Sequence, residues 1–274
     1  MKTRRLGTLS VILCFVLFLG VFLLLHLALP DRERSDNENR MLTKAPKFSF
    51  SALFSGSFTE DFEDYITDQF PLRDRWLDLK SRAERAWGKT ENNGVFFCRE
   101  DTLISRFKTP AGSAVDGAIR AVDSLAENTG LPVCLALIPS AAEIWSDRLP
   151  AHANTEDQSA LIRRIYENVS VTTADVLSAL QAHSSEPVYY RTDHHWTTLG
   201  AYYGYAATAQ ALGLTPRSLD SFRPETVSDA FYGTVYSSSG VRWVKPDSID
   251  IYVPAENVSL TRYEIGRASC RERV

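Results

Sequence analysis

The chain has 274 residues and a formal net charge of −4. Its first basic residues, Lys2, Arg4 and Arg5, precede a long apolar segment, so the part after that segment is more acidic than the whole chain. This balance argues against nucleic acid as a partner, because nucleic acid is bound by basic surfaces. It also gives no overall attraction to a polyanionic glycan, although a local basic groove would still be compatible with one.

The apolar segment runs without a charged residue from Leu6 to Leu29. A helix of about 20 apolar residues crosses a bilayer, and the basic residues before this one predict a cytoplasmic N-terminus. A cleaved signal peptide is the alternative, but the run from Leu27 to Asp31 is a poor cleavage site. We therefore expect a cytoplasmic stub at 1–5 and an uncleaved transmembrane signal anchor at 6–29. The protein would be single-pass in the cell membrane with its main domain extracytoplasmic.

After a charged linker at 30–47, helical and strand patterns alternate along the chain. This alternation favours an α/β fold with a mostly parallel sheet. The continuous apolar run at 132–139 predicts a strand that is buried on both faces. Helices are expected at 58–87 with a break near Pro71, and at 114–129, 157–168, 174–182 and 197–212. Strands are expected at 94–97, 102–104, 132–139, 170–172 and 188–190.

The cysteines give little information about the fold. Cys14 lies in the apolar segment and Cys270 near the C-terminus, which leaves Cys98 and Cys134. These two could pair in an oxidising compartment, but two separate buried thiols are favoured.

The run from Tyr189 to Trp196 contains two of the five histidines in the chain. Asp193 and His195 are two residues apart, so in an extended segment their side chains share one face. The carboxylate can then accept a hydrogen bond from one imidazole nitrogen and leave the other free as a general base, as in an acyl-transfer triad. His194 would point the other way and be structural.

Two other interpretations of this run stay open. Asp193 could cap the helix that follows, with the histidines packing or facing solvent. Alternatively, Asp193, His194 and His195 could ligate a metal, but a metal site usually needs a further well-spaced ligand and none is evident.

Other residues are candidates for the lining of a cleft. Ser140 follows a predicted strand, where sites gather in α/β sheets, although a serine there commonly caps the next helix. Trp196 could stack on a sugar or pack beneath the histidine. The serines at 237–239 precede Gly240 and are an alternative set of nucleophiles, but we expect them to lie in a loop. The full set of cleft candidates is Ser140, Trp196, Tyr236, Ser237 and Ser239.

The sequence Thr192-Asp193-His194-His195-Trp196 resembles the signature of the DHHW protein family. That family is similar to the SGNH-hydrolase-like domains of alginate O-acetyltransferase proteins. Further blocks resemble it too, and together they span roughly Asn37 to Tyr263: 38–40, 46–48, 62–65, 68–74, 93–97 and 231–240.

The resemblance implies an SGNH-hydrolase-like three-layer sandwich at 48–263, acting as an O-acetyltransferase on a cell-surface or secreted polysaccharide of the bacterial cell envelope. In such enzymes an Asp-x-His pair works with a serine later in the chain. A membrane-bound O-acyltransferase partner is implied by analogy, and no cofactor or metal is expected. The alternatives are a carbohydrate O-acetyl esterase and a non-catalytic glycan-binding or assembly scaffold.

The segment Glu264–Val274 departs from the family pattern and resembles a translated sequencing adapter. We expect it to be an artefact, so that the natural chain continues past Tyr263 and Ser269 is not a catalytic candidate. The family's serine lies in a short Asp-Ser segment further downstream. The domain as given is therefore expected to lack its nucleophile and its last strand and helix, and to be inactive.

Overall fold

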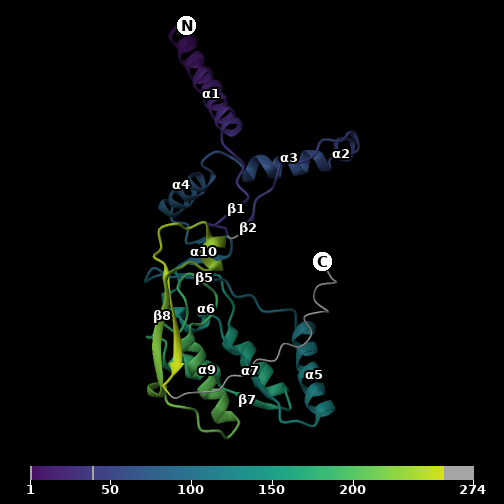
Figure 1. Ribbon diagram of the computed structural model, residues 1–274, viewed down its shortest axis with the longest axis vertical. Coiled ribbons are helices and arrows are strands. Elements are labelled where there is room, and N and C mark those ends of the chain that lie inside the picture. Colours follow the sequence, from purple (N-terminus) through teal and green to yellow (C-terminus); the bar gives the residue numbers. More distant parts are fainter. Residues whose placement is uncertain (1, 39, 256–274) are drawn as a thin grey trace.

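The computed structural model describes residues 2–38 and 40–255 (Figure 1). Helix α1 (Lys2–Ala28) extends away from the rest of the chain, and its Gly7–Ala28 portion has a mean hydropathy of 2.9. This portion is long and apolar enough to cross a membrane, in agreement with the apolar segment seen in the sequence.

Short elements follow α1 and connect it to the body of the protein. Strands β1 (Arg34–Ser35) and β2 (Arg40–Met41) pair antiparallel within the linker. Helices α2 (Phe50–Ser55), α3 (Ser57–Asp68) and α4 (Arg73–Ala86) come next. The predicted break near Pro71 is confirmed, because α3 ends before it and α4 begins after it.

The described strands form small separate sheets. Strands β3 (Glu91–Asn92), β4 (Val95–Phe97) and β5 (Leu103–Ser105) form an antiparallel sheet. Strands β6 (Cys134–Ala136) and β7 (Thr172–Ala174) form a parallel pair, and β8 (Phe222–Phe231) and β9 (Asp247–Pro254) form a long antiparallel hairpin. The architecture is α/β, but the mostly parallel sheet is not confirmed in the part of the chain that the structure describes.

Strand β6 also differs from its prediction. It is only three residues long and half-buried, and Ile138 just beyond it is 47% exposed. Among the described strands β6 pairs with β7 alone, so its other edge has no strand partner. The apolar run at 132–139 therefore does not form a strand buried on both faces.

The helices of the body lie close to their predicted positions, because local signals set their ends. Asp157, Asp175 and Thr197 accept hydrogen bonds from backbone N–H groups at the starts of α7, α8 and α9. The left-handed Gly130, with φ 62°, ends α5. The bounds are α5 (Gly112–Thr129), α6 (Ala141–Ile144), α7 (Gln158–Asn168), α8 (Val176–Ala182), α9 (Thr198–Ala211) and α10 (Thr234–Ser239), with 3₁₀ turns at Ser146–Arg148 and Leu219–Ser221.

Two hydrophobic clusters hold the body together. The first includes Trp145, Leu180 and Val188 and lies among α6, α8 and α9. The second includes Val95, Leu103, Val235 and Tyr236 and joins the β3–β5 sheet to α10. The segment after Tyr189, which belongs to the first cluster, runs from one cluster to the other, so both clusters fix the position of the Asp-His run.

Cys98 and Cys134 are free thiols that pack against the first cluster. Burial raises the pKa of the Cys98 thiol to about 12, so this thiol stays protonated at neutral pH.

Candidate functional site

The Asp-His run lies in a closed loop. Tyr189 and Trp196 form an antiparallel bridge, and the N–H of Tyr190 donates to the carbonyl of His195 at 3.2 Å. Residues 191–195 are bends, not an extended strand. Helix α9 begins directly after the loop and is capped by Thr197, so Asp193 does not cap the helix that follows it.

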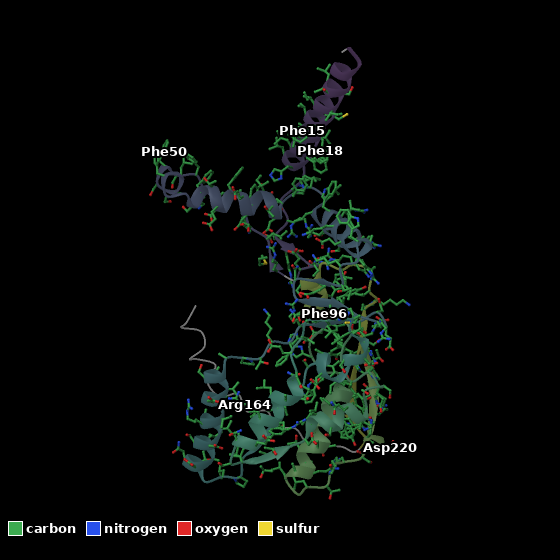
Figure 2. All side chains as sticks on the ribbon, turned by 180° about the vertical axis from the view of Figure 1, so that it is seen from behind. Phe15, Phe18, Phe50, Phe96, Arg164 and Asp220 are labelled. Atoms are coloured by element: carbon green, nitrogen blue, oxygen red, sulfur yellow. The ribbon has the colours of Figure 1, made fainter. Side chains whose placement is uncertain are left out.

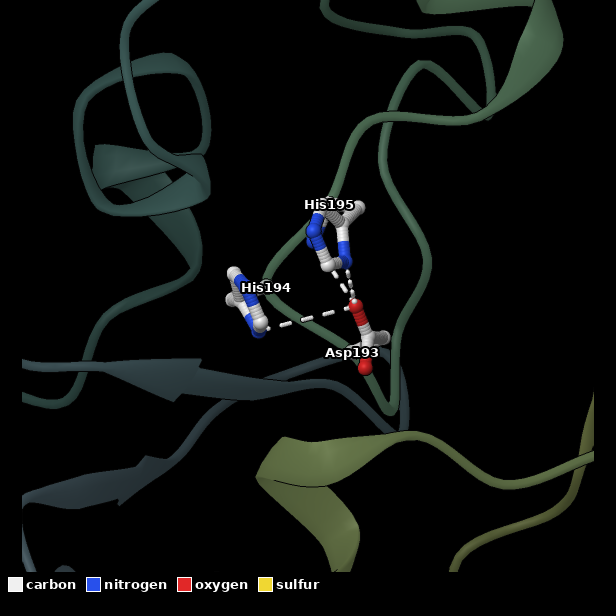
Figure 3. A group of neighbouring side chains, drawn as sticks. All are labelled: Asp193, His194 and His195. Carbon is white, nitrogen blue, oxygen red and sulfur yellow. Dashed lines mark hydrogen bonds and ion pairs between the residues drawn. The ribbon is translucent and has the colours of Figure 1, made fainter. Parts of the chain in front are cut away.

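The spacing of Asp193 and His195 nevertheless brings their side chains together. The Asp193 Oδ1 atom lies 2.5 Å from His195 Nδ1 and also accepts the His195 backbone N–H at 3.0 Å (Figure 3). The His195 side chain is 65% exposed, whereas that of Asp193 is 4% exposed. With Nδ1 bound to a buried carboxylate, the Nε2 atom is left as the nitrogen available to a reacting group.

Helix α10 holds the second carboxylate oxygen. Asp193 Oδ2 accepts the Thr234 backbone N–H at 2.7 Å and the Thr234 hydroxyl at 3.0 Å. Burial alone would raise the pKa of Asp193, but the hydrogen bonds from Thr234 and His195 outweigh it, and the pKa lies below its ordinary value. Asp193 is therefore ionised at neutral pH and can stabilise a protonated imidazole.

Gly233 allows this close contact. A Cβ atom on Gly233 would lie 2.2 Å from the Cβ of Asp193 and 2.3 Å from its Oδ2. Only glycine therefore lets the start of α10 approach the carboxylate at this distance.

Asp247, at the start of β9, holds the first residues of the loop by hydrogen bonds. Its Oδ2 accepts the Thr192 N–H at 2.9 Å and the Thr192 hydroxyl at 2.6 Å, and its Oδ1 accepts the Arg191 N–H at 3.1 Å. The Thr192 hydroxyl in turn accepts the Gly233 N–H at 3.2 Å. These hydrogen bonds join three segments that are distant in the sequence: the Asp-His loop, the start of α10 and the start of β9.

His194 does not point away from His195, contrary to the prediction. Their ring centroids are 3.8 Å apart, and His194 Nδ1 lies 2.8 Å from the Thr234 hydroxyl and 3.6 Å from Asp193 Oδ1 (Figure 3). The alternation of side chains applies only to extended backbone, and this segment is bent. Both histidines therefore lie beside the same carboxylate.

The donor atoms of Asp193, His194 and His195 lie within 4.8 Å of one another, a separation that could suit a metal ion. The contact between His195 Nδ1 and Asp193 Oδ1, however, has the length of a hydrogen bond and leaves no room for an ion between the two atoms. This geometry fits an oriented imidazole better than a metal centre.

The cleft candidates Ser140 and Trp196 make no hydrogen bond to Asp193 or His195 through their side chains. Ser140 lies at the start of α6, where its backbone N–H donates to Gln158, while its hydroxyl oxygen is buried without a hydrogen-bond partner and makes no cap bond. Trp196 packs on α9, against Gly200 and Gly204, and lines an apolar groove of about 450 Å³.

The serines at 237–239 lie in helix α10 and not in the expected loop. Ser237 donates to the carbonyl of Gly233 at 3.3 Å, and Ser239 is fully buried and donates to the carbonyl of Tyr236 at 2.9 Å. The Tyr236 ring lies against Tyr232 and beneath Arg242. Within residues 2–38 and 40–255, no serine hydroxyl is hydrogen bonded to His195.

Sequence reasoning missed Thr234, Gly233 and Asp247 as parts of the site. Gly233 and Thr234 lie in the block 231–240 that was noted for its resemblance, but nothing local to that block indicates contact with a loop 41 residues earlier. Asp247 carries no motif. A cavity of about 440 Å³ beside the loop is lined partly by Tyr190, Arg191 and Asp247, but not by Asp193 or His195.

A comparison with known protein families identifies the family to which the Asp-His loop belongs. The family model described as "DHHW protein" matches residues 113–264, which include the Asp-His loop and α10. The chain belongs to the DHHW protein family. The family resemblance stated from the sequence is thus confirmed, with a model match that begins at residue 113.

Curated relatives of this DHHW chain carry the name probable alginate O-acetylase AlgJ. The protein of Pseudomonas aeruginosa is 27% identical over 189 residues, which cover 63% of this chain and 46% of that protein. The protein of Pseudomonas syringae pv. tomato is 25% identical over 220 residues, covering 74% and 51%. The chain spans about half the length of the curated relatives it matches.

Among solved structures, a DHHW family protein from Eubacterium siraeum is similar to this chain. The two share 26% sequence identity and superpose with a TM-score of 0.53, over 60% of this chain and 55% of that one. The superposed part of this DHHW chain therefore has the same fold as a second member of the family.

Proposed function

We propose that this chain is part of a membrane-anchored, extracytoplasmic O-acetyltransferase that modifies a cell-surface or secreted polysaccharide through a Ser-His-Asp mechanism. The observation that carries the proposal is the pairing of a buried, ionised Asp193 with an exposed His195. The name of the curated relatives, probable alginate O-acetylase, supports the reaction type. An SGNH-hydrolase-like sandwich is part of the same proposal.

The proposed reaction has two acyl transfers. A serine hydroxyl attacks the acetyl carbonyl of the donor and gives its proton to Nε2 of His195, which returns that proton to the donor's leaving group. A sugar hydroxyl then attacks the acetyl-serine and gives its proton to the same nitrogen. The proton passes back to the serine oxygen as the acetyl–serine bond breaks. The serine is the one that the family resemblance places downstream of Tyr263, outside the described residues.

The described residues would keep the imidazole ready for these steps. Asp193 fixes the ring by its bond to Nδ1 and stabilises the imidazolium that forms in each transfer. Thr234 and the start of α10 hold the other oxygen, so the carboxylate cannot rotate away from the ring. Donor acetyl groups originate in the cytoplasm, and a membrane-bound O-acyltransferase partner that hands them across is part of this proposal.

The first prediction concerns His195. In a protein that carries the proposed serine, His195→Ala should lower kcat/KM for an acetylated chromogenic ester by about 10²–10⁴-fold, because a general base contributes a factor of this size. Steady-state hydrolysis of the ester measures the effect. The control is His152→Asn, since His152 is exposed and has a left-handed backbone, φ 61°, that asparagine tolerates. Equal turnover by the parent and His195→Ala would remove His195 from the mechanism.

An acceptor assay separates transfer from hydrolysis, because both reactions use the same catalytic groups. The parent protein is supplied with the acetyl ester and an oligosaccharide acceptor, and the products are analysed by mass spectrometry. Acetylated oligosaccharide that disappears in His195→Ala supports a transferase. Free acetate alone, with every acceptor unmodified, would instead identify an esterase.

A further inference from the structure

Helices α2 and α3 form an arm that runs sideways from the base of α1 (Figure 1). Aromatic rings follow one another along this arm. Phe50 contacts Phe48, Phe48 contacts Phe58 and Phe58 contacts Phe62, with centroid separations of 5.3, 5.3 and 5.9 Å. We call the set Phe48, Phe50, Phe54, Phe58 and Phe62 the aromatic arm.

The aromatic arm is largely uncovered by protein. Phe50 is 71% exposed and Phe54 86% exposed, and Figure 2 shows Phe50 at the free end, away from the body. Soluble surfaces rarely expose large apolar groups in a continuous row, so such a row marks a contact surface. Among the acidic residues of α3, Glu60 and Asp64 lie on the side opposite Phe58 and Phe62, because each is two residues from Phe62 in a helix of 3.6 residues per turn. Asp61 and Glu63, which adjoin Phe62 in the sequence, lie along the two edges of the aromatic face.

The row of rings is continuous with α1. Phe62 lies 6.2 Å from Tyr65, and Tyr65 lies 5.5 Å from the ring of His26. The apolar face of the arm therefore begins at the level of His26, two residues before the apolar portion of α1 ends at Ala28.

Contacts between α1 and the residues after α3 show how far Phe70 and Trp76 lie from the end of the apolar portion of α1. Phe22 stacks on Phe70 at 5.3 Å and lies 5.8 Å from Trp76, at the start of α4. Phe22 is six residues before Ala28, or about 9 Å along the helix, and the Gly7–Ala28 portion is about 33 Å long, against a hydrocarbon layer of about 30 Å. If α1 crosses the bilayer, Phe70 and Trp76 lie at or below the boundary between headgroups and hydrocarbon.

We infer that the aromatic arm and the start of α4 rest in the interfacial layer of the bilayer that α1 crosses. Lipid is the occupant that the geometry favours, because the arm is continuous with a helix whose own contacts place Trp76 at lipid depth. The apolar rings enter the acyl chains while the acidic side of α3 faces water. The body of the protein is then held to the membrane by both α1 and the aromatic arm, which together fix its orientation relative to the bilayer. This inference depends on the membrane anchor and not on acetyl transfer.

Photocrosslinking tests this inference with the full chain in nanodiscs of phosphatidylcholine. Phe54→p-benzoylphenylalanine places a photoreactive ring where an exposed ring already lies, and Glu60→p-benzoylphenylalanine is the control on the opposite face of the arm. After illumination, mass spectrometry should find several-fold more lipid adduct at position 54 than at position 60. Equal adducts at both positions, or a crosslink from position 54 to a second copy of the chain, would overturn the inference.

A second measurement leaves the arm unaltered. Brominated phosphatidylcholine quenches the fluorescence of tryptophans that lie in the acyl region. The quenched fraction of the emission should fall in Trp76→Phe and should not fall in Trp243→Phe, because Trp243 packs against Phe97 in the body. An unchanged quenched fraction in Trp76→Phe would overturn the inference. Neither measurement uses enzymatic activity, so an inactive protein would not affect the result.

Discussion

Gly233 carries the strongest steric constraint on the Asp-His pair. The backbone at this position lies against the side chain of Asp193, and the next residue, Thr234, donates two hydrogen bonds to that carboxylate. The carboxylate is thus held by a segment 41 residues further along the chain. The orientation of His195 depends on how closely α10 approaches.

Gly233→Ala should therefore disturb both stability and the site. The new methyl group would lie 2.2 Å from the Cβ of Asp193, so the loop or α10 must move. We expect the free energy of unfolding to fall by about 1–3 kcal/mol, the usual cost of overpacking, as measured by urea denaturation.

Gly112→Ala is the matched control for this substitution. Gly112 has no heavy atom within 4 Å of its Cβ position and lies in the first turn of α5. Its substitution should change stability by less than about 0.5 kcal/mol. Identical urea midpoints for the two variants would show that Asp193 does not depend on Gly233.

The sequence predicted the partnership of Asp193 and His195 but not its local conformation. In a strand, side chains two residues apart lie on the same face. Here the segment is a bent loop, and Asp193 and His195 meet because the His195 N–H donates to the Asp193 carboxylate. The predicted direction of the His194 side chain was wrong, because side chains alternate between two faces only in extended backbone and this segment is bent. Thr234 could not be found from the sequence, because contacts between segments 41 residues apart leave no local pattern.

At the scale of the elements, Asp68 ties the linker to the end of α3. Its carboxylate accepts bonds from Arg40 Nη1 at 2.8 Å, Arg40 Nη2 at 2.5 Å and the Thr43 N–H at 2.9 Å. The hydrogen bond from the Arg40 guanidinium holds the pKa of Asp68 below its ordinary value. The linker after α1 is therefore held firmly to the arm.

Asp68→Ala should release this part of the linker. Losing about 1.4 kcal/mol of local stability raises the open fraction roughly tenfold, so trypsin should cut after Arg40 and Lys44 about ten times faster. Timed digestion followed by mass spectrometry measures the rate. Asp64→Ala removes an exposed carboxylate from the same helix and should leave the rate unchanged. Equal cleavage rates in both variants would mean that the linker is held elsewhere.

The helices were more predictable from the sequence than the sheets were. Caps such as Asp157 and Thr197 and the terminating Gly130 are local signals, so the helices lie near their expected positions. Strand pairing joins distant segments and depends on which partners are present. The β8–β9 hairpin was not expected, because its first strand contains Pro224 and many exposed polar residues.

At the scale of the whole molecule, α1 is the element that is long and apolar enough to cross a membrane. Its apolar window has no buried residue, as a lipid-facing helix requires, although Phe22 and His26 near its end contact the body. The sequence already predicted this helix, because an uncharged, mostly apolar segment of this length needs no tertiary context. The sequence could not predict which residues contact its end.

We expect α1 to remain attached in the mature protein. The end of the apolar segment lacks the small-x-small pattern that a signal peptidase needs before its cleavage site, because His26 stands two residues before Ala28. Intact-mass measurement of the protein purified from membranes should therefore show residues 1–29 retained. A mature chain that begins just after Ala28 would contradict the anchor and identify a cleaved signal peptide.

Helix α10 packs against elements that are close to α1. Ser81 of α4 donates to the carbonyl of Gly240 at the end of α10, and α4 contacts α1 through Trp76 and Phe22 (Figure 1). The Asp-His pair is thereby connected to α1 through two packed helices, α10 and α4. If the proposed reaction and the membrane anchor are both correct, acetylation is confined to polymer that reaches the anchored enzyme, and polymer already released into the medium would escape modification.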